Sequence, residues 1–157
     1  MFVVPPSVSV ACALVAVAVL ISNVAEPQTP SDGSTNVRAE HETATMLEGT
    51  WLREYSEADV RVRRLLRLAP GGEFRESVRV VDAAGQVHRM EHEGQWLYDG
   101  TNLKRKYTLM DGKPPSRLNV PFATFEVSFA TRDEFTGVNH VYRNTVRYRR
   151  VEADLSF

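Results

Sequence analysis

Residues 60–81 read VRVRRLLRLAPGGEFRESVRVV, and this stretch decides the fold. Two runs in which apolar and charged residues largely alternate flank the turn sequence Pro70-Gly71-Gly72. Alternation with a period of two places apolar side chains on one face of a strand and charged side chains on the other. The stretch therefore predicts two antiparallel β-strands, residues 60–68 and 73–81, joined by a short turn.

The same pattern continues on both sides of this hairpin. Turn clusters rich in Gly, Asp, Ser and Pro separate further apolar runs, and no stretch of ten residues shows a helical period. We expect the further strands to span residues 47–55, 86–98, 101–110, 118–130 and 135–151, and Gly137 or Asn139 can divide the last of them. The sequence thus predicts an all-β protein, a small antiparallel up-and-down barrel of seven or eight strands.

Composition excludes two classes of protein. The 157 residues carry a formal net charge of −1, and 43% of them are hydrophobic. This chain is too apolar for an intrinsically disordered protein and lacks the basic excess of a nucleic-acid binder. We therefore expect no nucleic-acid partner.

The N-terminal region sets the expected compartment. Residues 1–25 contain no charged side chain, and residues 8–25 are almost entirely apolar. That run is long for the core of a signal peptide and marginal for a membrane span, which needs about 20 apolar residues. We expect a signal peptide or signal anchor over residues 1–25, a flexible polar linker over 26–45 and the barrel over 46–157. The protein is then exported, periplasmic or secreted, or anchored in the inner membrane by residues 8–25, its only membrane contact.

The start of the predicted barrel carries a family resemblance. Leu47-Glu48-Gly49-Thr50-Trp51 resembles the G-x-W opening of lipocalins, and Gly94-Gln95-Trp96 repeats the motif. The domain resembles the small exported bacterial lipocalin-like proteins of the calycin superfamily. The resemblance implies that Gly49 and Trp51 lie at the closed end of the barrel. It also implies that Arg147 or Arg149 of the last strand covers Trp51 in a cation–π contact.

Strand alternation predicts the residues that line the barrel interior. Arg64 and Glu76 fall on otherwise apolar faces, and Arg105 shares a face with Leu103, Tyr107 and Leu109. Such a lumen suits an amphiphile with an anionic head group. The other reading is that Arg64 simply pairs with Glu76 in a filled barrel. The candidate lumen residues are Arg53, Arg64, Glu76, His88, Met90, His92, Arg105 and Tyr107.

The sequence gives little indication of a catalytic or metal site. The sequence has no nucleophile elbow, no phosphate-binding glycine loop and no H-E-x-x-H motif. His88 and His92 lie about 13 Å apart along a strand and cannot hold one ion together, although either could join Met90. We expect no enzyme activity, no cofactor and no metal site.

Two functions follow as hypotheses. The first is an exported, noncatalytic lipocalin-like barrel that binds a small amphipathic or hydrophobic molecule in its lumen. The alternative is a membrane-tethered structural or interaction module whose filled barrel presents a basic outer face to an anionic membrane surface or an acidic partner. That face consists of Arg61, Arg63, Arg67, Arg75 and Arg79.

Overall fold

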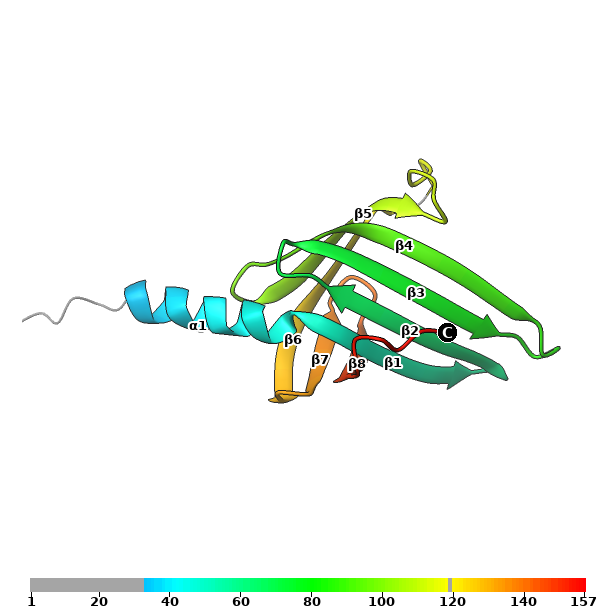
Figure 1. Cartoon of the computed structure of the whole chain (residues 1–157), viewed down its shortest axis with the longest axis horizontal. Coiled ribbons are helices and arrows are strands. Elements are labelled where there is room, and N and C mark those ends of the chain that lie inside the picture. The colour runs from blue at the N-terminus through cyan, green and yellow to red at the C-terminus, as the bar shows by residue number, and fades with distance from the viewer. Residues whose placement is uncertain (1–32, 119) are drawn as a thin grey trace, which may run out of the picture. The chain divides into compact units, whose positions relative to one another are not determined.

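Eight antiparallel strands form a closed up-and-down barrel in the computed structural model, which describes residues 33–118 and 120–157 (Figure 1). This confirms the predicted fold class. Each strand pairs with its neighbour in sequence, and β1 also pairs with β8. The strands are β1 (Gly49–Glu57), β2 (Val60–Leu68), β3 (Glu73–Val81), β4 (Val87–Tyr98), β5 (Asn102–Met110), β6 (Phe122–Thr131), β7 (Glu134–Asn139) and β8 (Asn144–Arg150).

The hairpin of β2 and β3 forms as predicted. Leu68 lies opposite Phe74 and Arg61 opposite Val81. Gly72 has a φ of 81°, a left-handed conformation that a glycine adopts without strain, and this closes the turn. Apolar side chains of both strands point into the barrel, while most arginines point outward.

A helix precedes the barrel, where we expected a flexible linker. α1 (Gly33–Leu47) ends inside the predicted barrel domain, and β1 begins two residues after it. An ion pair between residues one helical turn apart, Arg38 and Glu42 at 3.0 Å, stabilises the helix. Leu47 at the end of the helix is fully buried. The burial of Leu47 in the barrel core stabilises this helix, although residues 33–47 show no helical period of apolar residues. The sequence pattern therefore did not predict it. The predicted signal or anchor segment, residues 1–25, lies outside the described residues, and within the described part no helix is long and apolar enough to cross a membrane.

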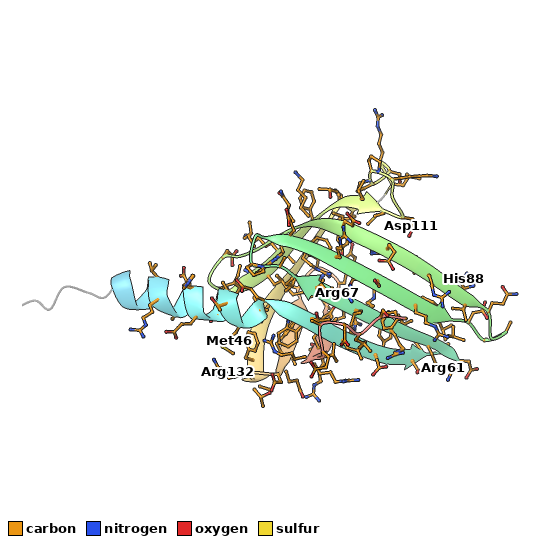
Figure 2. All side chains as sticks on the ribbon, in the orientation of Figure 1. Met46, Arg61, Arg67, His88, Asp111 and Arg132 are labelled. Atoms are coloured by element: carbon orange, nitrogen blue, oxygen red, sulfur yellow. The ribbon has the colours of Figure 1, made fainter. Side chains whose placement is uncertain are left out.

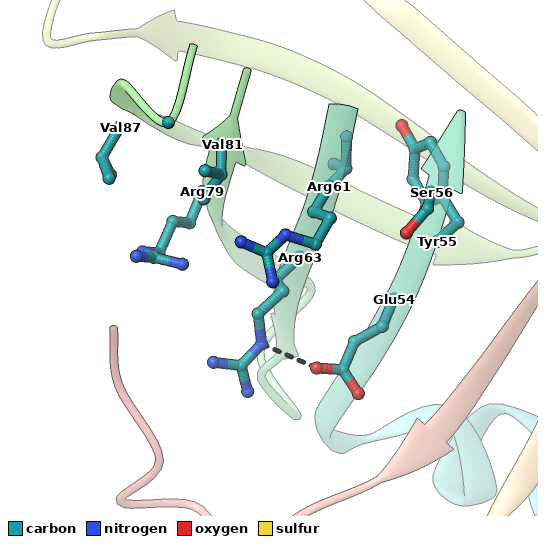
Figure 3. Close-up of a pocket in the computed structure, with 10 residues that line it drawn as sticks. Glu54, Tyr55, Ser56, Arg61, Arg63, Arg79, Val81 and Val87 are labelled. Atoms are coloured by element: carbon teal, nitrogen blue, oxygen red, sulfur yellow. Dashed lines mark hydrogen bonds and ion pairs between the residues drawn. The ribbon is translucent and has the colours of Figure 1, made fainter. Parts of the chain in front are cut away.

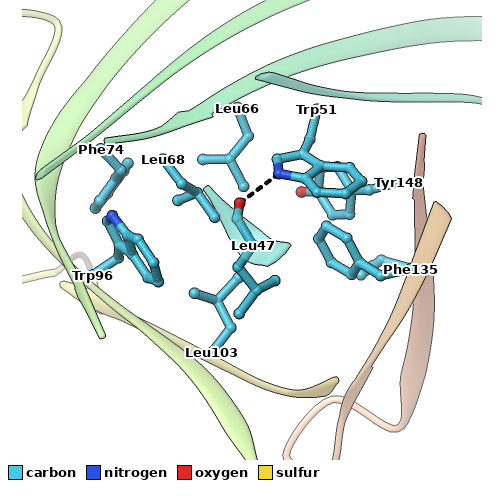
Figure 4. Close-up of a cluster of buried hydrophobic side chains, with 10 residues drawn as sticks. Leu47, Trp51, Leu66, Leu68, Phe74, Trp96, Leu103, Phe135 and Tyr148 are labelled. Carbon is cyan, nitrogen blue, oxygen red and sulfur yellow. Dashed lines mark hydrogen bonds between the residues drawn. The ribbon is translucent and has the colours of Figure 1, made fainter. Parts of the chain in front are cut away.

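Trp51 closes one end of the barrel (Figure 4). Its indole N–H donates to the Leu47 carbonyl at 2.7 Å, and its ring packs edge-on against Phe135 at 4.7 Å. Ten buried apolar side chains form this core: Leu47, Trp51, Leu66, Leu68, Phe74, Trp96, Leu103, Phe135, Val146 and Tyr148.

The arginine that covers Trp51 is Arg150, not Arg147 or Arg149. Its guanidinium carbon lies 4.2 Å from the Trp51 ring centroid, and it donates hydrogen bonds to the Glu48 and Met46 carbonyls. Tyr148 is buried inside the barrel, so Arg147 and Arg149 alternate to the outside, where they pair with Glu134 and Glu54. The prediction of Arg147 or Arg149 was therefore wrong, because Arg150 is the arginine that shares the inward face of β8 with Tyr148.

A register shift changes the face of Leu109, which we expected beside Arg105. The pairing of β4 with β5 shifts between Glu93 and Gly94, so that Leu109 lies opposite Glu93 and Met110 opposite His92. Directly opposed residues share a face, so Leu109 leaves the face of Arg105, where we expected it. Gly94 permits the close approach, because a Cβ there would collide with the Lys106 carbonyl.

The C-terminal residues 151–157 lie along the outside of β1 and β2. The Arg67 guanidinium donates to the Leu155 carbonyl at 2.6 Å, and the Arg63 guanidinium lies 4.9 Å from the Phe157 ring centroid. Leu52 and Leu65, which lie opposite each other on this outer face, are each only 2% exposed. In Figure 2, Met46 and Arg132 mark the end of the barrel that Trp51 closes, and Arg61 and His88 mark the opposite end.

Candidate functional site: a charged cluster in the barrel lumen

Glu76 is the centre of a charged cluster inside the barrel. It lies in the middle of β3 and is fully buried. Its Oε1 lies 3.3 Å from Nη1 of Arg105, and its Oε2 lies 3.3 Å from Nη1 of Arg64. Oε2 also lies 3.4 Å from Nδ1 of His92, which is directly opposite on β4. The structure thus brings together four of the predicted lumen residues.

Arg105 is 3% exposed, and the rings of Phe74, Tyr107 and Phe125 surround its guanidinium at 5.5–5.6 Å. Its Nε and Nη1 form no hydrogen bond within the described part of the chain. Nε of Arg64 is also buried and also forms no hydrogen bond within the described part of the chain. Oε1 of Glu76, which lies 3.3 Å from Nη1 of Arg105, forms no hydrogen bond among the described residues either. Buried polar atoms without a partner are costly, so the hydrogen-bonding capacity of this cluster is incompletely satisfied.

Electrostatics keep the cluster ionised. Burial alone would raise the pKa of Glu76, but the charge of Arg105, the hydrogen bond with His92 and the charge of Arg64 together hold that pKa well below its ordinary value. For Arg105, burial opposes the charged form, yet the Glu76 carboxylate raises its pKa overall. Burial raises the pKa of Tyr107 to about 12, so its phenol stays protonated and can donate a hydrogen bond.

Positive charge exceeds negative charge in the lumen. Arg53 shares the inward face of β1 with Trp51, and its guanidinium lies 4.3 Å from the Tyr55 ring centroid. Among the described residues of the inward faces, Arg53, Arg64 and Arg105 therefore stand against the buried carboxylate of Glu76, and Glu57 adds a carboxylate only at the exposed end of β1. This excess favours an anion over a neutral or cationic group.

An apolar wall lies beside the cluster. Phe125, Val127 and Phe129 of β6, together with Tyr107 of β5, are only partly buried although they pack against the core. Partly exposed apolar side chains on the inner face leave surface for the hydrocarbon part of a ligand. The cluster and this wall have the two parts that an amphiphile with an anionic head requires.

The other predicted lumen residues do not join the cluster. The side chain of His88 is 58% exposed near the rim, and its Nε2 lies 3.2 Å from the Asp82 carboxylate. Met90 is half-buried opposite Val78. Within the described part of the chain, no three metal-ligating side chains gather into a site.

Sequence reasoning missed Tyr148 and Tyr55 as neighbours of the charges. Tyr148 is buried, and burial raises the pKa of its phenol. The signal was present, because Val146 and Tyr148 alternate with Thr145, Arg147 and Arg149 on the last strand. That alternation places Tyr148 on the inner face of β8.

A hollow of about 730 Å³ lies on the outer face of β1 to β3, near the turn between β3 and β4 (Figure 3). The guanidinium groups of Arg61, Arg63 and Arg79 point into it, and Arg63 bonds Glu54 at 2.7 Å. These arginines belong to the predicted basic outer face. Of the other two residues of that face, Arg67 bonds the Leu155 carbonyl and Arg75 pairs with Glu93 at 3.7 Å.

A scan against protein-family models finds no match to this chain, and a search of curated proteins finds none either. The barrel shape agrees with the lipocalin resemblance but does not by itself identify a lipocalin-like family.

Proposed function

We propose that the barrel is a noncatalytic carrier or receptor for a small amphipathic molecule, whose anionic head binds at Arg105 and Arg64 and whose apolar part lies along β5 and β6. The lipocalin-like resemblance of the Gly49 and Trp51 motif supports the same reading. Export to the periplasm or the exterior belongs to this proposal and is supported by the apolar run of residues 8–25.

One observation carries the proposal. Arg105 is almost completely buried, and two of its nitrogen atoms lack hydrogen bonds although Glu76 lies beside it. Glu76 divides its two oxygens among three basic side chains, so its charge does not balance the lumen. A carboxylate or similar anion would satisfy the free donors and reduce the excess positive charge.

The test compares two probes that differ only in charge. The full-length chain is titrated with cis-parinaric acid and with its methyl ester, and fluorescence reports binding. We expect the acid to bind at least about tenfold more tightly than the ester, since only the acid gives the arginines a charged acceptor. Equal affinity for both probes, or binding of neither, would refute the proposal.

Two matched variants, Arg64→Gln and Arg147→Gln, test whether the acid binds in the lumen. Arg64→Gln removes a lumen charge from a side chain that is 28% exposed, whereas Arg147→Gln removes the same charge from an outward-facing side chain of β8. We expect Arg64→Gln to weaken binding of the acid and leave the ester unchanged. Arg147→Gln should change neither, and an equal effect of both variants would show that the acid responds only to overall charge.

A further inference from the structure

A row of arginines crosses the outer face of the barrel. Arg63 of β2, Arg79 of β3 and Arg89 of β4 lie directly opposite one another in consecutive strand pairs. Directly opposed residues have Cβ atoms about 4.5–5.5 Å apart, and like charges in such pairs destabilise a sheet. Arg61 lies two residues from Arg63 on the same face and is the diagonal neighbour of Arg79.

Few carboxylates neutralise this row. Glu54 pairs with Arg63 at 2.7 Å, but it also pairs with Arg149 at 3.1 Å. Asp82, at the nearby turn, pairs with His88 and accepts hydrogen bonds from the Ala84 and Gln86 amides. Across the described residues, no carboxylate pairs with Arg61, Arg79 or Arg89.

Three of these arginines meet at one place. Arg61, Arg63 and Arg79 line the outer hollow, and Figure 3 shows their guanidinium groups converging on the same space. Ser56 also lines the hollow, and its exposed side chain offers a hydroxyl. Val81 and Val87, which lie opposite each other, provide apolar surface beside the charges. The hollow therefore combines forked cationic donors, a hydroxyl and a small apolar wall.

We propose that this hollow is a binding site for a phosphomonoester, whose phosphate group is held by Arg61, Arg63 and Arg79. Three guanidinium groups against the one carboxylate of Glu54 leave two positive charges in excess, which match a phosphate dianion. A volume of about 730 Å³ exceeds that of a phosphate group alone, so the organic part of the ester has room beside Val81 and Val87. The site lies on the opposite side of the sheet from the lumen cluster and does not depend on it.

The test measures phosphate binding by the full-length chain with isothermal titration calorimetry. Two probes share the phosphomonoester group: glycerol 3-phosphate, and dihexanoyl phosphatidic acid below its micelle concentration. Dihexanoyl phosphatidylcholine, a phosphodiester with no net charge, is the control ligand. We expect both phosphomonoesters to bind and the phosphatidylcholine not to bind.

Variants distinguish phosphate binding in the hollow from binding in the lumen and from an effect of overall charge. Arg79→Gln and Arg61→Gln should each weaken phosphomonoester binding at least tenfold. Arg143→Gln removes the same charge from an exposed turn between β7 and β8, and Arg64→Gln removes one from the lumen. Neither control should change the affinity for glycerol 3-phosphate. Because Arg79→Gln also relieves repulsion from Arg63 and Arg89, its thermal midpoint should equal or exceed that of the wild type, so that weaker binding does not reflect unfolding.

The source of the phosphate group follows from the two probes. Equal affinities, both lost in Arg79→Gln, show a site for soluble phosphomonoesters, whereas at least tenfold tighter binding of phosphatidic acid, also lost in Arg79→Gln, shows a lipid head-group site. The proposal is overturned if neither phosphomonoester binds. It is also overturned if Arg79→Gln binds both as the wild type does, or if Arg143→Gln weakens binding as much as Arg79→Gln. Binding of phosphatidic acid alone that is lost in Arg64→Gln and kept in Arg79→Gln overturns it too, because the lumen then holds the lipid.

Discussion

Arg105 and Glu76 face each other inside the barrel, with Nη1 of the arginine 3.3 Å from Oε1 of the carboxylate. Both side chains are almost completely buried, so each charge depends on the other for its stability in the folded protein. The relationship is unequal, because Glu76 has three basic partners and Arg105 has one carboxylate. That inequality leaves positive charge in the lumen and underlies the proposed function.

Replacement of Arg105 tests the dependence of Glu76 on its partner. Arg105→Met keeps much of the apolar stem but leaves a buried carboxylate with less compensation, so we expect the free energy of unfolding to fall by about 3–5 kcal/mol. Urea titration measures the change. The double variant Arg105→Met/Glu76→Gln removes the buried negative charge and should recover at least half of the loss. A loss below about 1 kcal/mol in the single variant would mean that Glu76 does not need Arg105.

Acid should destabilise the barrel through Glu76. The pKa of Glu76 is lowered in the folded state by Arg105, His92 and Arg64 despite its burial, from an ordinary value of 4.5. A lowered folded-state pKa adds stability above pH 4.5, and this contribution is lost as the pH falls from there toward the folded-state pKa. Urea titrations at a series of pH values should show a steeper acid loss in the wild type than in Glu76→Gln. Parallel curves for the two proteins would remove Glu76 as the cause.

Loss of Trp51 should open the closed end of the barrel. The ring is fully buried, packs on Phe135 and Phe129 and lies beneath Arg150. Trp51→Ala should lower the free energy of unfolding by about 3–5 kcal/mol, the usual cost of deleting a buried tryptophan. Arg150→Met, which keeps the aliphatic contact but removes the cation, should cost less. A tryptophan variant as stable as the wild type would contradict the packing of this core.

Alanine substitutions at Gly94 and Gly71 test the close approach of β4 and β5 at the register shift, with Gly71 as the control. A Cβ at Gly94 would collide with the Lys106 carbonyl and lie 2.7 Å from the Phe74 ring, whereas a Cβ at Gly71 meets only the Glu73 carboxylate at 4.0 Å. Gly94→Ala should therefore cost about 3 kcal/mol or more, and Gly71→Ala less than about 0.5 kcal/mol. Thermal and urea unfolding measure both variants. Equal effects would show that β4 and β5 do not approach closely at this point.

Local alternation predicted the fold because each strand carries its own pattern. The runs around Pro70-Gly71-Gly72 and the turn Asp99-Gly100 appear in the structure as hairpins with the expected partners. The same alternation placed Arg64, Glu76 and Arg105 on inner faces, and the structure brings them together. Short-range order was sufficient for these residues because the barrel joins neighbours in sequence.

Features that depend on distant contacts escaped prediction. Residues 33–47 form a helix whose last residue, Leu47, is held by the barrel core, and nothing in the local pattern encodes that burial. The shift at Gly94 moves Leu109 to the other face, which alternation alone cannot reveal. Arg150 was missed because the choice among neighbouring arginines depends on which one shares the face of Tyr148.

The most direct test of the central claim measures the affinities of cis-parinaric acid and its methyl ester for Glu76→Gln. This substitution keeps the shape of the side chain but removes the only carboxylate of the cluster, so Arg105 and Arg64 lose their competing anion. If the lumen binds an anionic head group at these arginines, the acid should bind about tenfold more tightly than to the wild type, and the ester should bind as before. Weaker binding of the acid, or an equal change for acid and ester, would contradict the account.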